Sequence, residues 1–328
     1  MTEIVVTAPA RLHFGMLDPA GLGARRFGGF GVGIESPRVV VRVRWAGGRA
    51  GSDCSDAVIV SGSQPHRAMT FARRIWSTFG LSGGVEVNVD ESIPPHMGLG
   101  SGTKLGLAIA RGLAGLAGIP AGPEQLAEAS GRGARSSVGS WTFAAPGLVV
   151  EAGVSDGGWI SPLVARHPMP ERWRCVLALP LGVEGLSGDA EERFFGQLRE
   201  SGHAELSVSR LLLTALLPGL LAGDIDEFGG ALTQIQREVG SIFAAQQGGV
   251  FHPSAAPLVD ALHALGVGAV GQSSWGPSVY GIVDGPELAA DVADRLRVTA
   301  RAGTEVSAVD FDRRGAWIAR GGSGQAAA

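Results

Sequence analysis

Apolar and polar residues alternate along two stretches in the first half of the chain. Residues 37–45 alternate valine with arginine, and residues 85–90 read Val-Glu-Val-Asn-Val-Asp. Successive side chains of a strand point to opposite faces, so both stretches predict strands with one buried and one solvated face. The β-branched run at residues 3–7 predicts another strand. We expect the arginines of residues 37–45 to face solvent without a functional role.

Helical spacing replaces this alternation elsewhere. Apolar residues recur three or four positions apart over residues 66–80, and residues 104–118 are rich in Leu, Ala and Ile. Both segments predict helices with a core-facing side. The other elements predicted in this half are strands at 57–60, 146–151 and 158–160 and a helix at 124–130.

The second half begins after His167-Pro168-Met169-Pro170, whose two prolines indicate a domain boundary. We predict one domain at residues 1–168, a second at 169–320 and a disordered tail at 321–328. The second domain is predicted to contain strands at 174–181, 266–271, 279–283 and 304–310 and helices at 191–201, 207–221, 225–243, 254–265 and 286–298. Helices and strands mixed in two halves predict an α+β protein.

Composition narrows the class of protein. The 328 residues are 45% apolar and 18% charged, which suffices for sizeable cores. The net charge is −4, and basic residues occur in runs of at most two, so the footprint of a nucleic-acid-binding protein is missing. Cys54 and Cys175 form no zinc or disulfide pattern. The N-terminus has no signal layout, and the most apolar run, residues 211–222, is short for a membrane span. We expect a cytoplasmic enzyme without nucleic-acid or membrane partners.

A glycine-rich stretch connects a predicted strand to a predicted helix. Residues 94–103 read Pro-Pro-His-Met-Gly-Leu-Gly-Ser-Gly-Thr. The glycines permit left-handed backbone angles and a close approach of peptide N–H groups to a ligand. The N–H groups and the dipole at the start of the helix favour an anion, and the two hydroxyls can reach a phosphate oxygen or phosphate-bound Mg²⁺. The predicted phosphate-binding residues are Gly98, Leu99, Gly100, Ser101, Gly102 and Thr103.

This stretch matches neither of two common phosphate loops. No Lys-Ser/Thr pair closes a G-x-x-x-x-G, as the Walker loop requires. A dinucleotide fingerprint would need an acidic residue at the end of a second strand about 20 residues on, but a helix stop and loop, Gly118-Ile-Pro120-Ala-Gly122-Pro, follows the helix. A flexible turn is the plainer alternative, but the strand before and the helix after favour a third kind of phosphate loop.

The first predicted strand continues into polar residues that could meet a ligand. Arg11, His13 and Asp18 lie in this segment. The alternatives are a histidine satisfied within an ordinary strand and, for Asp18 before a proline, a turn residue. Further on, Arg25 and Arg26 precede a run of glycines and could bind a phosphate or carboxylate with both guanidinium nitrogens. A hairpin loop with solvated arginines is the alternative there.

Two further segments carry candidate residues. Residues 131–140 hold Arg132, Arg135 and three serines in a glycine-rich loop, which indicates anion contact unless the loop is simply solvated. Glu151 is the acidic residue of this half considered for Mg²⁺, although a solvent-facing side chain is the simpler expectation. Residues 271–278 read Gly-Gln-Ser-Ser-Trp-Gly-Pro-Ser, and the tryptophan could stack on an aromatic ligand or pack at a domain interface.

Three of these segments together resemble a known family. The glycine-rich stretch resembles the phosphate loop of the GHMP small-molecule kinase superfamily. The segments Ala-Arg-Leu-His-Phe-Gly at 10–15, Phe-Gly-Gly-Phe-Gly at 27–31 and Gly-Gln-Ser-Ser-Trp-Gly-Pro at 271–277 are similar to the β-ribofuranosylaminobenzene 5′-phosphate synthases within it. The resemblance covers nearly the whole chain. It implies a ribosomal S5 domain 2-like N-terminal half and a ferredoxin-like C-terminal half, with the ligand between them.

The resemblance also implies a reaction, phosphoribosyl transfer without ATP. In it, 4-aminobenzoate attacks C1 of phosphoribosyl pyrophosphate through the ring carbon that bears its carboxylate. Pyrophosphate and CO₂ leave, and a C–C-linked riboside remains, an early step toward methanopterin-type one-carbon carriers. The implied cofactor is Mg²⁺, with no nicotinamide, flavin or haem, and the implied assembly is a homodimer. A 4-hydroxy acceptor stays open, because one polar substituent leaves no readable trace in the sequence.

The resemblance suggests roles for individual residues. The proposed catalytic residues are His13, Arg26 and Asp18. Gly28, Gly29 and Arg132 would join the glycine-rich stretch in binding phosphate or pyrophosphate. The residues expected to shape the aromatic pocket are Arg11, Gln272, Ser273, Ser274 and Trp275. Ser101 and Thr103 would contact Mg²⁺.

One departure separates this chain from many kinases of the superfamily. Those kinases carry an aspartate in a Ser-Gly-x-Asp stretch that helps to deprotonate an alcohol. The comparable segment here, Ser136-Ser137-Val138-Gly139, has no carboxylate. Attack by a ring carbon deprotonates no hydroxyl, so the synthase interpretation is unaffected. An ATP-dependent kinase and a non-catalytic sensor of a nucleotide or phosphosugar remain alternatives.

Overall fold

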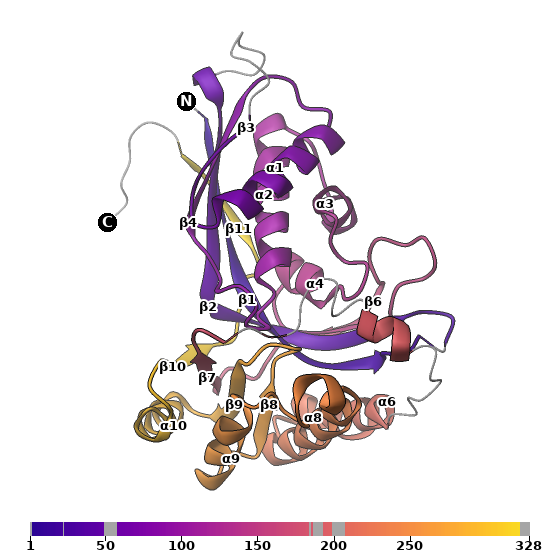
Figure 1. The fold of residues 1–328 in the computed structure, drawn as a ribbon, viewed down its shortest axis with the longest axis vertical. Helices are drawn as coiled ribbons and strands as arrows, with labels where there is room; N and C mark the ends of the chain where they lie inside the picture. Colours follow the sequence, from indigo (N-terminus) through magenta and orange to yellow (C-terminus); the bar gives the residue numbers. More distant parts are fainter. Residues whose placement is uncertain are drawn as a thin grey trace.

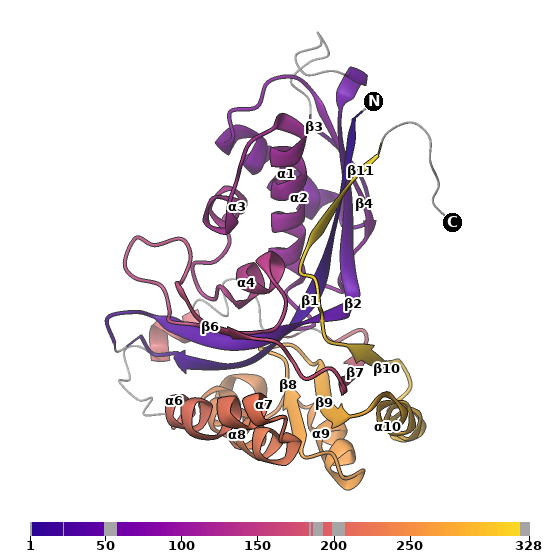
Figure 2. The same ribbon diagram turned by 180° about the vertical axis from the view of Figure 1, so that it is seen from behind.

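Two β-sheets with helices packed against them form the protein (Figures 1 and 2). The structure, a computed structural model, describes residues 2–21, 23–48, 58–183, 185, 193–198 and 207–321. The order of helices and strands along the chain confirms the predicted α+β class.

The first sheet has the strand order β11-β1-β2-β4-β3, with β5 paired to β2 and β6 paired to β5. Its strands are β1 (Glu3–Asp18), β2 (Phe27–Trp45), β3 (Val58–Gly62), β4 (Val85–Glu91), β5 (Leu148–Glu151), β6 (Leu163–His167) and β11 (Trp317–Gly321). A 3₁₀ turn, η1 (Ala46–Gly48), follows β2, and the helices of this half are α1 (Pro65–Thr78), α2 (Ser101–Ala117), α3 (Pro123–Ser130) and α4 (Val138–Ala144). The helices lie on one face of the sheet, where α2 packs against β1 and β2 (Figure 1).

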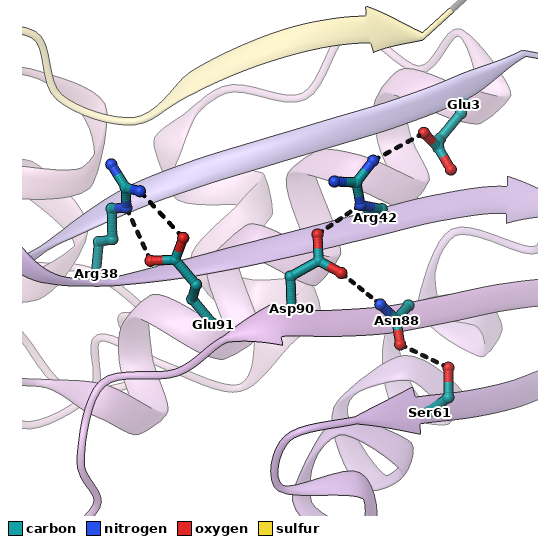
Figure 3. Close-up of polar contacts among 7 residues, drawn as sticks. All are labelled: Glu3, Arg38, Arg42, Ser61, Asn88, Asp90 and Glu91. Carbon is teal, nitrogen blue, oxygen red and sulfur yellow. Dashed lines mark hydrogen bonds and ion pairs between the residues drawn. The ribbon is translucent and has the colours of Figure 1, made fainter.

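The opposite face of this sheet carries ion pairs between neighbouring strands (Figure 3). Arg38 on β2 forms two hydrogen bonds to Glu91 on β4, of 2.9 and 3.0 Å. Arg42 lies between Asp90 and Glu3. These pairs confirm that the arginines of the alternating stretch belong to a solvated face, and exposed pairs of this kind stabilise a fold only slightly.

The second sheet is antiparallel, with the strand order β10-β7-β9-β8. Its strands are β7 (Trp173–Pro180), β8 (Ala269–Gln272), β9 (Val279–Asp284) and β10 (Thr304–Asp310). The helical segments of this half are α6 (Val208–Leu211), the π-helical turn η2 (Leu212–Leu216), α7 (Leu217–Ala222), α8 (Ile225–Gln247), α9 (Ala256–Ala264) and α10 (Pro286–Thr299). Residues 193–198 are also helical.

The hairpin formed by β1 and β2 joins the two halves. It extends beyond the helices of the first half and lies along the second half, next to α8 (Figures 1 and 2). Phe14 on this hairpin packs against Phe30, Phe228 and Tyr280, with ring centroids 5.1–6.4 Å apart. One apolar core therefore runs from the first sheet into the second.

Three sequence predictions differ from the structure. Residues 158–160 form no strand, with a bend at 159–160, and the strand of this region is β6. The predicted loop at 131–140 gives way to α4 at Val138. Gly321, assigned to the tail, ends β11, which pairs with β1 in the first sheet. The division into domains at 168/169 stays a prediction.

Some predictions fall outside the described residues: Ala57, Cys54, the two ends of the helix at 191–201, and the tail at 322–328. Among the residues that the structure describes, no helix is both long enough and apolar enough to cross a bilayer.

Candidate active site

The glycine-rich stretch forms a tight turn between β4 and α2. Gly98 and Gly100 have φ angles of 76° and 78°, a left-handed conformation that glycine adopts without steric cost. Gly100 is the N-cap residue of α2, so the helix begins at Ser101. The first-turn N–H groups and the positive end of the helix dipole lie at this turn, which is suited to an anion.

The turn lies directly against the loop between β8 and β9. The Ser273 hydroxyl donates a 2.7 Å hydrogen bond to the carbonyl oxygen of Gly98. A Cβ atom on Gly98 would overlap the backbone of Ser273, and one on Gly276 would overlap the backbone of Met97. Backbone from the two halves of the chain thus meets at this point, as the predicted site between the halves requires.

Three arginines surround the turn. The Arg11 guanidinium donates to the carbonyl oxygen of Gly98. Arg67, from the first turn of α1, lies over Gly102 and approaches the Ser101 hydroxyl at 3.4 Å. Arg132 lies 3.2 Å from the position that a Cβ on Gly102 would take.

Burial of these cations beside a helix N-terminus is electrostatically unfavourable without an anion. Burial lowers the pKa of Arg67 below its ordinary value. None of the ion pairs found within the described residues involves Arg67. The arrangement is therefore suited to an anion.

A cavity of about 110 Å³ lies beside the turn, between β1, α8 and the β8–β9 loop. Its polar lining comes from Arg11, His13, Arg135, Ser136, Gln236, Gln247, Gln272 and Ser274. Its apolar lining comes from Met16, Phe195, Val239, Phe243, Val250, Phe251 and Trp275, with Phe14, Gly15 and Gly240 completing the wall. Arg11 contacts both the turn and the cavity, so the anion site and the aromatic-lined cavity adjoin.

His13 is buried at the polar end of the cavity. The pairing of β1 with β2 shifts register between His13 and Gly15, an irregularity that re-aims a side chain. The Nε2 atom of His13 is 3.1 Å from the Ser136 hydroxyl, and its backbone N–H donates to Ser273 at 3.0 Å. Burial and the nearby charge of Arg11 lower the pKa of His13 to about 3, so the ring is neutral at physiological pH.

The glutamines of the cavity form one hydrogen-bonded group. The Gln236 side chain donates to the carbonyl oxygen of Phe14 and accepts from the Gln272 backbone at 2.8 Å. The Gln272 amide donates to Gln247 and to the Ser274 carbonyl, both at 3.2 Å. These bonds fix the polar lining on α8 relative to β1.

Trp275 packs at the interface and also lines the cavity. Its ring contacts Phe243 with centroids 3.7 Å apart, and it contacts Phe194 and Phe195 at 5.5 Å. The packing role expected for this residue agrees with these contacts, and stacking on an aromatic ligand stays a prediction.

Some residues predicted for the site lie elsewhere. The Asp18 carboxylate accepts 2.8 Å hydrogen bonds from the backbone of Gly21 and Gly23, as a turn residue does. Arg26 pairs with Asp156 at 3.3 Å. Neither Asp18 nor Arg26 lines the cavity, so their predicted catalytic roles are not part of the function proposed below.

Gly28 packs against Ala152, and Gly29 lies against the His13 ring. Their phosphate-binding role stays a prediction. Glu151 was expected to face solvent and is instead completely buried.

Sequence reasoning missed several residues. Arg67 was assigned only to a helix, and the chain's single lysine, Lys104, received no role. Phe195 and Phe243 were assigned only to predicted helices. A helical pattern does not distinguish a residue that faces the core from one that faces a cavity. The sequence therefore showed only that these two positions are apolar.

A metal would find few protein ligands at the turn. No group of three or more His, Cys, Asp or Glu side chains within the described residues could hold an ion. Ser101 and Thr103, in the first turn of α2, are the hydroxyls predicted for Mg²⁺. Mg²⁺ is commonly bound through substrate phosphates and waters, so these residues fit an ion that arrives with a phosphorylated substrate.

The α+β fold, with its glycine-rich turn beside an aromatic-lined cavity, can be compared with known protein families. The family model described as "GHMP kinases N terminal domain" matches residues 66–142. The model described as "GHMP kinases C terminal" matches residues 216–300. Both halves of the chain are therefore similar to GHMP kinases.

Solved structures of small-molecule kinases share the fold. A homoserine kinase from Cytophaga hutchinsonii superimposes with a TM-score of 0.70 at 16% identity, covering 97% of each chain. The L. major mevalonate kinase in complex with R-mevalonate has a TM-score of 0.68 at 11% identity, covering 94% of this chain and 95% of that one.

The curated relatives are synthases by name. The β-ribofuranosylphenol 5′-phosphate synthase of Methanothermobacter thermautotrophicus is 29% identical over 86% of this chain and 89% of its own length. The protein of the same name from Archaeoglobus fulgidus is 29% identical over 84% of this chain and 86% of its own length. The resemblance stated from three segments of the sequence is thereby confirmed.

Proposed function

We propose that the protein is an enzyme that condenses phosphoribosyl pyrophosphate with a 4-substituted benzoate, releasing pyrophosphate and CO₂. The observation that carries this proposal is Arg11, which contacts the glycine-rich turn on one side and lines the aromatic cavity on the other. An anionic leaving group and an aromatic acceptor could thus be held next to each other.

The pyrophosphate would occupy the turn at residues 98–103. Backbone N–H groups at the start of α2 would bind its oxygens, with Arg67 and Arg132 adding charge-assisted hydrogen bonds. These donors are fixed before the reaction, so they stabilise the charge that develops on the departing pyrophosphate. Mg²⁺, bound with the substrate, would neutralise part of that charge.

The benzoate would occupy the cavity. An apolar cavity of about 150 Å³ accommodates benzene in another protein, and this cavity is of similar size at about 110 Å³. Phe243 and Trp275 would contact the faces and edges of the ring. Arg11 and Arg135 at the polar end could bind the carboxylate.

The reaction balances without an added base. The ring carbon bearing the carboxylate forms a bond to C1 of the ribose, while the C1–O bond breaks and its electron pair leaves with pyrophosphate. The bond to the carboxylate then breaks, CO₂ leaves, and its electron pair restores the aromatic ring. No Asp or Glu is found among the described residues lining the cavity, which agrees with chemistry that deprotonates no hydroxyl.

The names of the relatives bear on the acceptor. They specify a ribofuranosylphenol, a product with a ring hydroxyl. The sequence favoured 4-aminobenzoate and left a 4-hydroxy analogue open. The proposal therefore includes both acceptors. We also propose that the product serves methanopterin-type biosynthesis in the cytoplasm and that the enzyme acts as a homodimer.

The test supplies purified protein with phosphoribosyl pyrophosphate, Mg²⁺ and carboxyl-labelled 4-aminobenzoate or 4-hydroxybenzoate. We expect ¹⁴CO₂ release that depends on both substrates, at a higher rate with the true acceptor. Absence of ¹⁴CO₂ from both acceptors, with phosphorylation of an added alcohol by ATP, would contradict the proposal and favour a kinase.

Variants at α1 test the pyrophosphate site in the same assay. Arg67→Ala should raise the KM for phosphoribosyl pyrophosphate by roughly 10- to 100-fold, because a charge-assisted hydrogen bond is lost. Arg73→Ala is the matched control, an exposed arginine on the same helix, and should leave the KM unchanged. Equal effects of the two substitutions would exclude a specific contact of Arg67 with the pyrophosphate.

A further inference from the structure

The orientation of the Gln236 amide is fixed by backbone groups. Gln236 lines the cavity from α8, and its Nε2 atom donates to the carbonyl oxygen of Phe14. Its Oε1 atom accepts from the backbone N–H of Gln272 at 2.8 Å. A carbonyl oxygen only accepts and a backbone N–H only donates, so these two contacts distinguish Nε2 from Oε1. The amide cannot be turned over without the loss of both hydrogen bonds.

The neighbouring amides are fixed in the same way. Oε1 of Gln272 accepts from the backbone N–H of His252 at 2.7 Å. Nε2 of Gln272 donates to the Ser274 carbonyl and to Oε1 of Gln247, both at 3.2 Å. Nε2 of Gln247 donates to the Val250 carbonyl at 2.8 Å. Both hydrogens of the Gln272 amide are thus used within the protein, which leaves neither for a ligand.

Gln236 has hydrogen-bonding capacity that the described part of the protein does not use. An amide side chain has two hydrogens on its nitrogen and two lone pairs on its oxygen. Among the described residues, Gln236 has a partner for one of each. The residue is only 6% exposed, and a buried amide hydrogen without a partner costs free energy. The cavity is the place where a ligand can supply that partner.

Two nearby groups are less suited to this role. Gln247 has the same unused capacity, but it lies in the last turn of α8 and is half-buried, so water can pair with it. The Tyr280 hydroxyl is close to the Gln236 amide, since a Cβ on Gly271 would lie 2.4 Å from this hydroxyl and 2.7 Å from the amide carbon. This hydroxyl has no partner among the described residues, but Tyr280 does not line the cavity.

The place of Gln236 along the cavity fits the length of the proposed acceptor. Arg11 and Phe14, whose carbonyl binds Gln236, are three residues apart on β1, which is roughly 10 Å along a strand. A benzoate with its carboxylate on Arg11 would span about this distance to its 4-substituent, with a hydrogen bond at each end. Gln236 therefore lies near the end of the ring opposite the carboxylate.

We propose that Gln236 is a specificity-determining residue that binds the 4-substituent of the benzoate through the unused hydrogen and lone pair of its amide. The identity of the ligand rests on the proposed function. A hydroxyl can accept from Nε2 or donate to Oε1. An amino group, whose lone pair is delocalised into the ring, only donates and leaves the Nε2 hydrogen unpaired. An unsubstituted ring pairs with neither atom.

The unmodified protein tests this recognition without turnover. Isothermal titration calorimetry measures the Kd of 4-hydroxybenzoate, 4-aminobenzoate and unsubstituted benzoate. We expect 4-hydroxybenzoate to bind roughly 10-fold more tightly than benzoate, as one hydrogen bond to a buried group provides, with 4-aminobenzoate between them. Equal affinities for 4-hydroxybenzoate and benzoate would overturn the proposal, and this comparison requires no variant to fold.

Substitutions show whether Gln236 is the group responsible. In Gln236→Leu and in Gln236→Met, each checked by thermal melting, the two ligands should differ by less than about threefold, because neither side chain forms the hydrogen bond. Tyr280→Phe is the matched control, since it removes a buried hydroxyl beside the amide and should preserve the difference. A difference retained in the Gln236 variants, or lost equally in Tyr280→Phe, would contradict the role of Gln236.

The ¹⁴CO₂ assay separates this role from the proposed reaction. In the unmodified protein, kcat/KM should be higher with 4-hydroxybenzoate than with 4-aminobenzoate, and Gln236→Leu should bring the ratio toward one. If Gln236 sets the difference in affinity but neither acceptor yields ¹⁴CO₂, the reaction fails while the recognition by Gln236 stands. If ¹⁴CO₂ is released with an unchanged ratio in Gln236→Leu, the reaction stands and the role of Gln236 is overturned.

Discussion

At the scale of single residues, Lys104 is the residue whose surroundings most change its chemistry. It is the only lysine in the chain, lies in the first turns of α2 and is completely buried. Its Nζ atom donates to the Thr142 hydroxyl at 3.0 Å and lies 6.0 Å from the centre of the Phe143 ring. Burial lowers the pKa of Lys104 to about 7, with the charge of Asp312 opposing and that of Arg11 adding to the decrease.

Two measurements check this pKa. Because the chain has one lysine, ¹³C-lysine labelling gives a single Cε signal, and we expect its pH titration to have a midpoint near 7. The folded pKa lies below the ordinary 10.5, so the unfolded chain binds more protons between about pH 7 and 10.5. The free energy of unfolding should therefore rise with pH in this window, by at most about 1.4 kcal/mol per unit from this group.

Urea denaturation at pH 7 and pH 9 measures the second effect, with Lys104→Met as the comparison. This variant keeps most of the side-chain volume and has no titrating amine, so its stability should depend less on pH. A midpoint above 10 in the NMR titration would show that the folded protein accommodates the charged amine without penalty.

At the scale of elements, the site depends on the contact between the glycine-rich turn and the β8–β9 loop. Gly276 has no room for a side chain, because a Cβ atom would overlap the backbone of Met97 and Gly98. The Ser273 hydroxyl links the same two loops by donating to Gly98. The positions of the glycine-rich turn and the aromatic-lined cavity are thus set by one backbone contact.

Gly276→Ala should separate these loops. We expect the free energy of unfolding to fall by about 1–3 kcal/mol, as overpacking typically causes. We also expect ¹⁴CO₂ release to fall more than stability alone explains. Gly268→Ala is the control, since nothing lies within 4 Å of a Cβ there. Unchanged activity and urea midpoint in Gly276→Ala would mean that the loops tolerate separation.

At the scale of the whole molecule, the chain crosses between its halves more than once. The β1–β2 hairpin brings Phe14 into the core of the second half. In the opposite direction, the segment after β10 returns to the first sheet, where β11 pairs with residues 3–7 of β1. Each sheet therefore includes or contacts segments from both halves, which makes their relative position part of the fold.

Removal of residues 317–328 tests this crossing. Loss of β11 should lower the free energy of unfolding by about 2–4 kcal/mol, since several backbone hydrogen bonds of roughly 0.5–1.5 kcal/mol each disappear. Hydrogen exchange should become faster at residues 3–7. Removal of residues 322–328 alone is the control and should change neither quantity. Equal exchange at residues 3–7 in the two truncated proteins would show that β11 does not protect β1.

Much of the fold was readable from local patterns. Alternation predicted β4 and part of β2, and helical spacing predicted α1, α2, α8 and α10, because their buried faces repeat along one segment. The strand at 158–160 was wrong, since a short apolar run does not distinguish a strand from a bend. β11 was missed because its partner, β1, is some 300 residues away in the sequence.

The sequence alone predicted an anion site, since glycines, hydroxyls and the start of a helix are adjacent in the chain and need no distant partner. It also marked Arg11, His13 and the loop at 271–277 as chemically significant. Only the tertiary structure decided which cations reach the site. Folding brings Arg67 and Arg132 to Gly102 and leaves Arg26 with Asp156. The same folding buries Glu151, whose carboxylate accepts a hydrogen bond from the Ser137 backbone. Which charged residues meet, and which are buried, depends on contacts between segments that are far apart in the sequence. A local sequence pattern contains no information on such contacts.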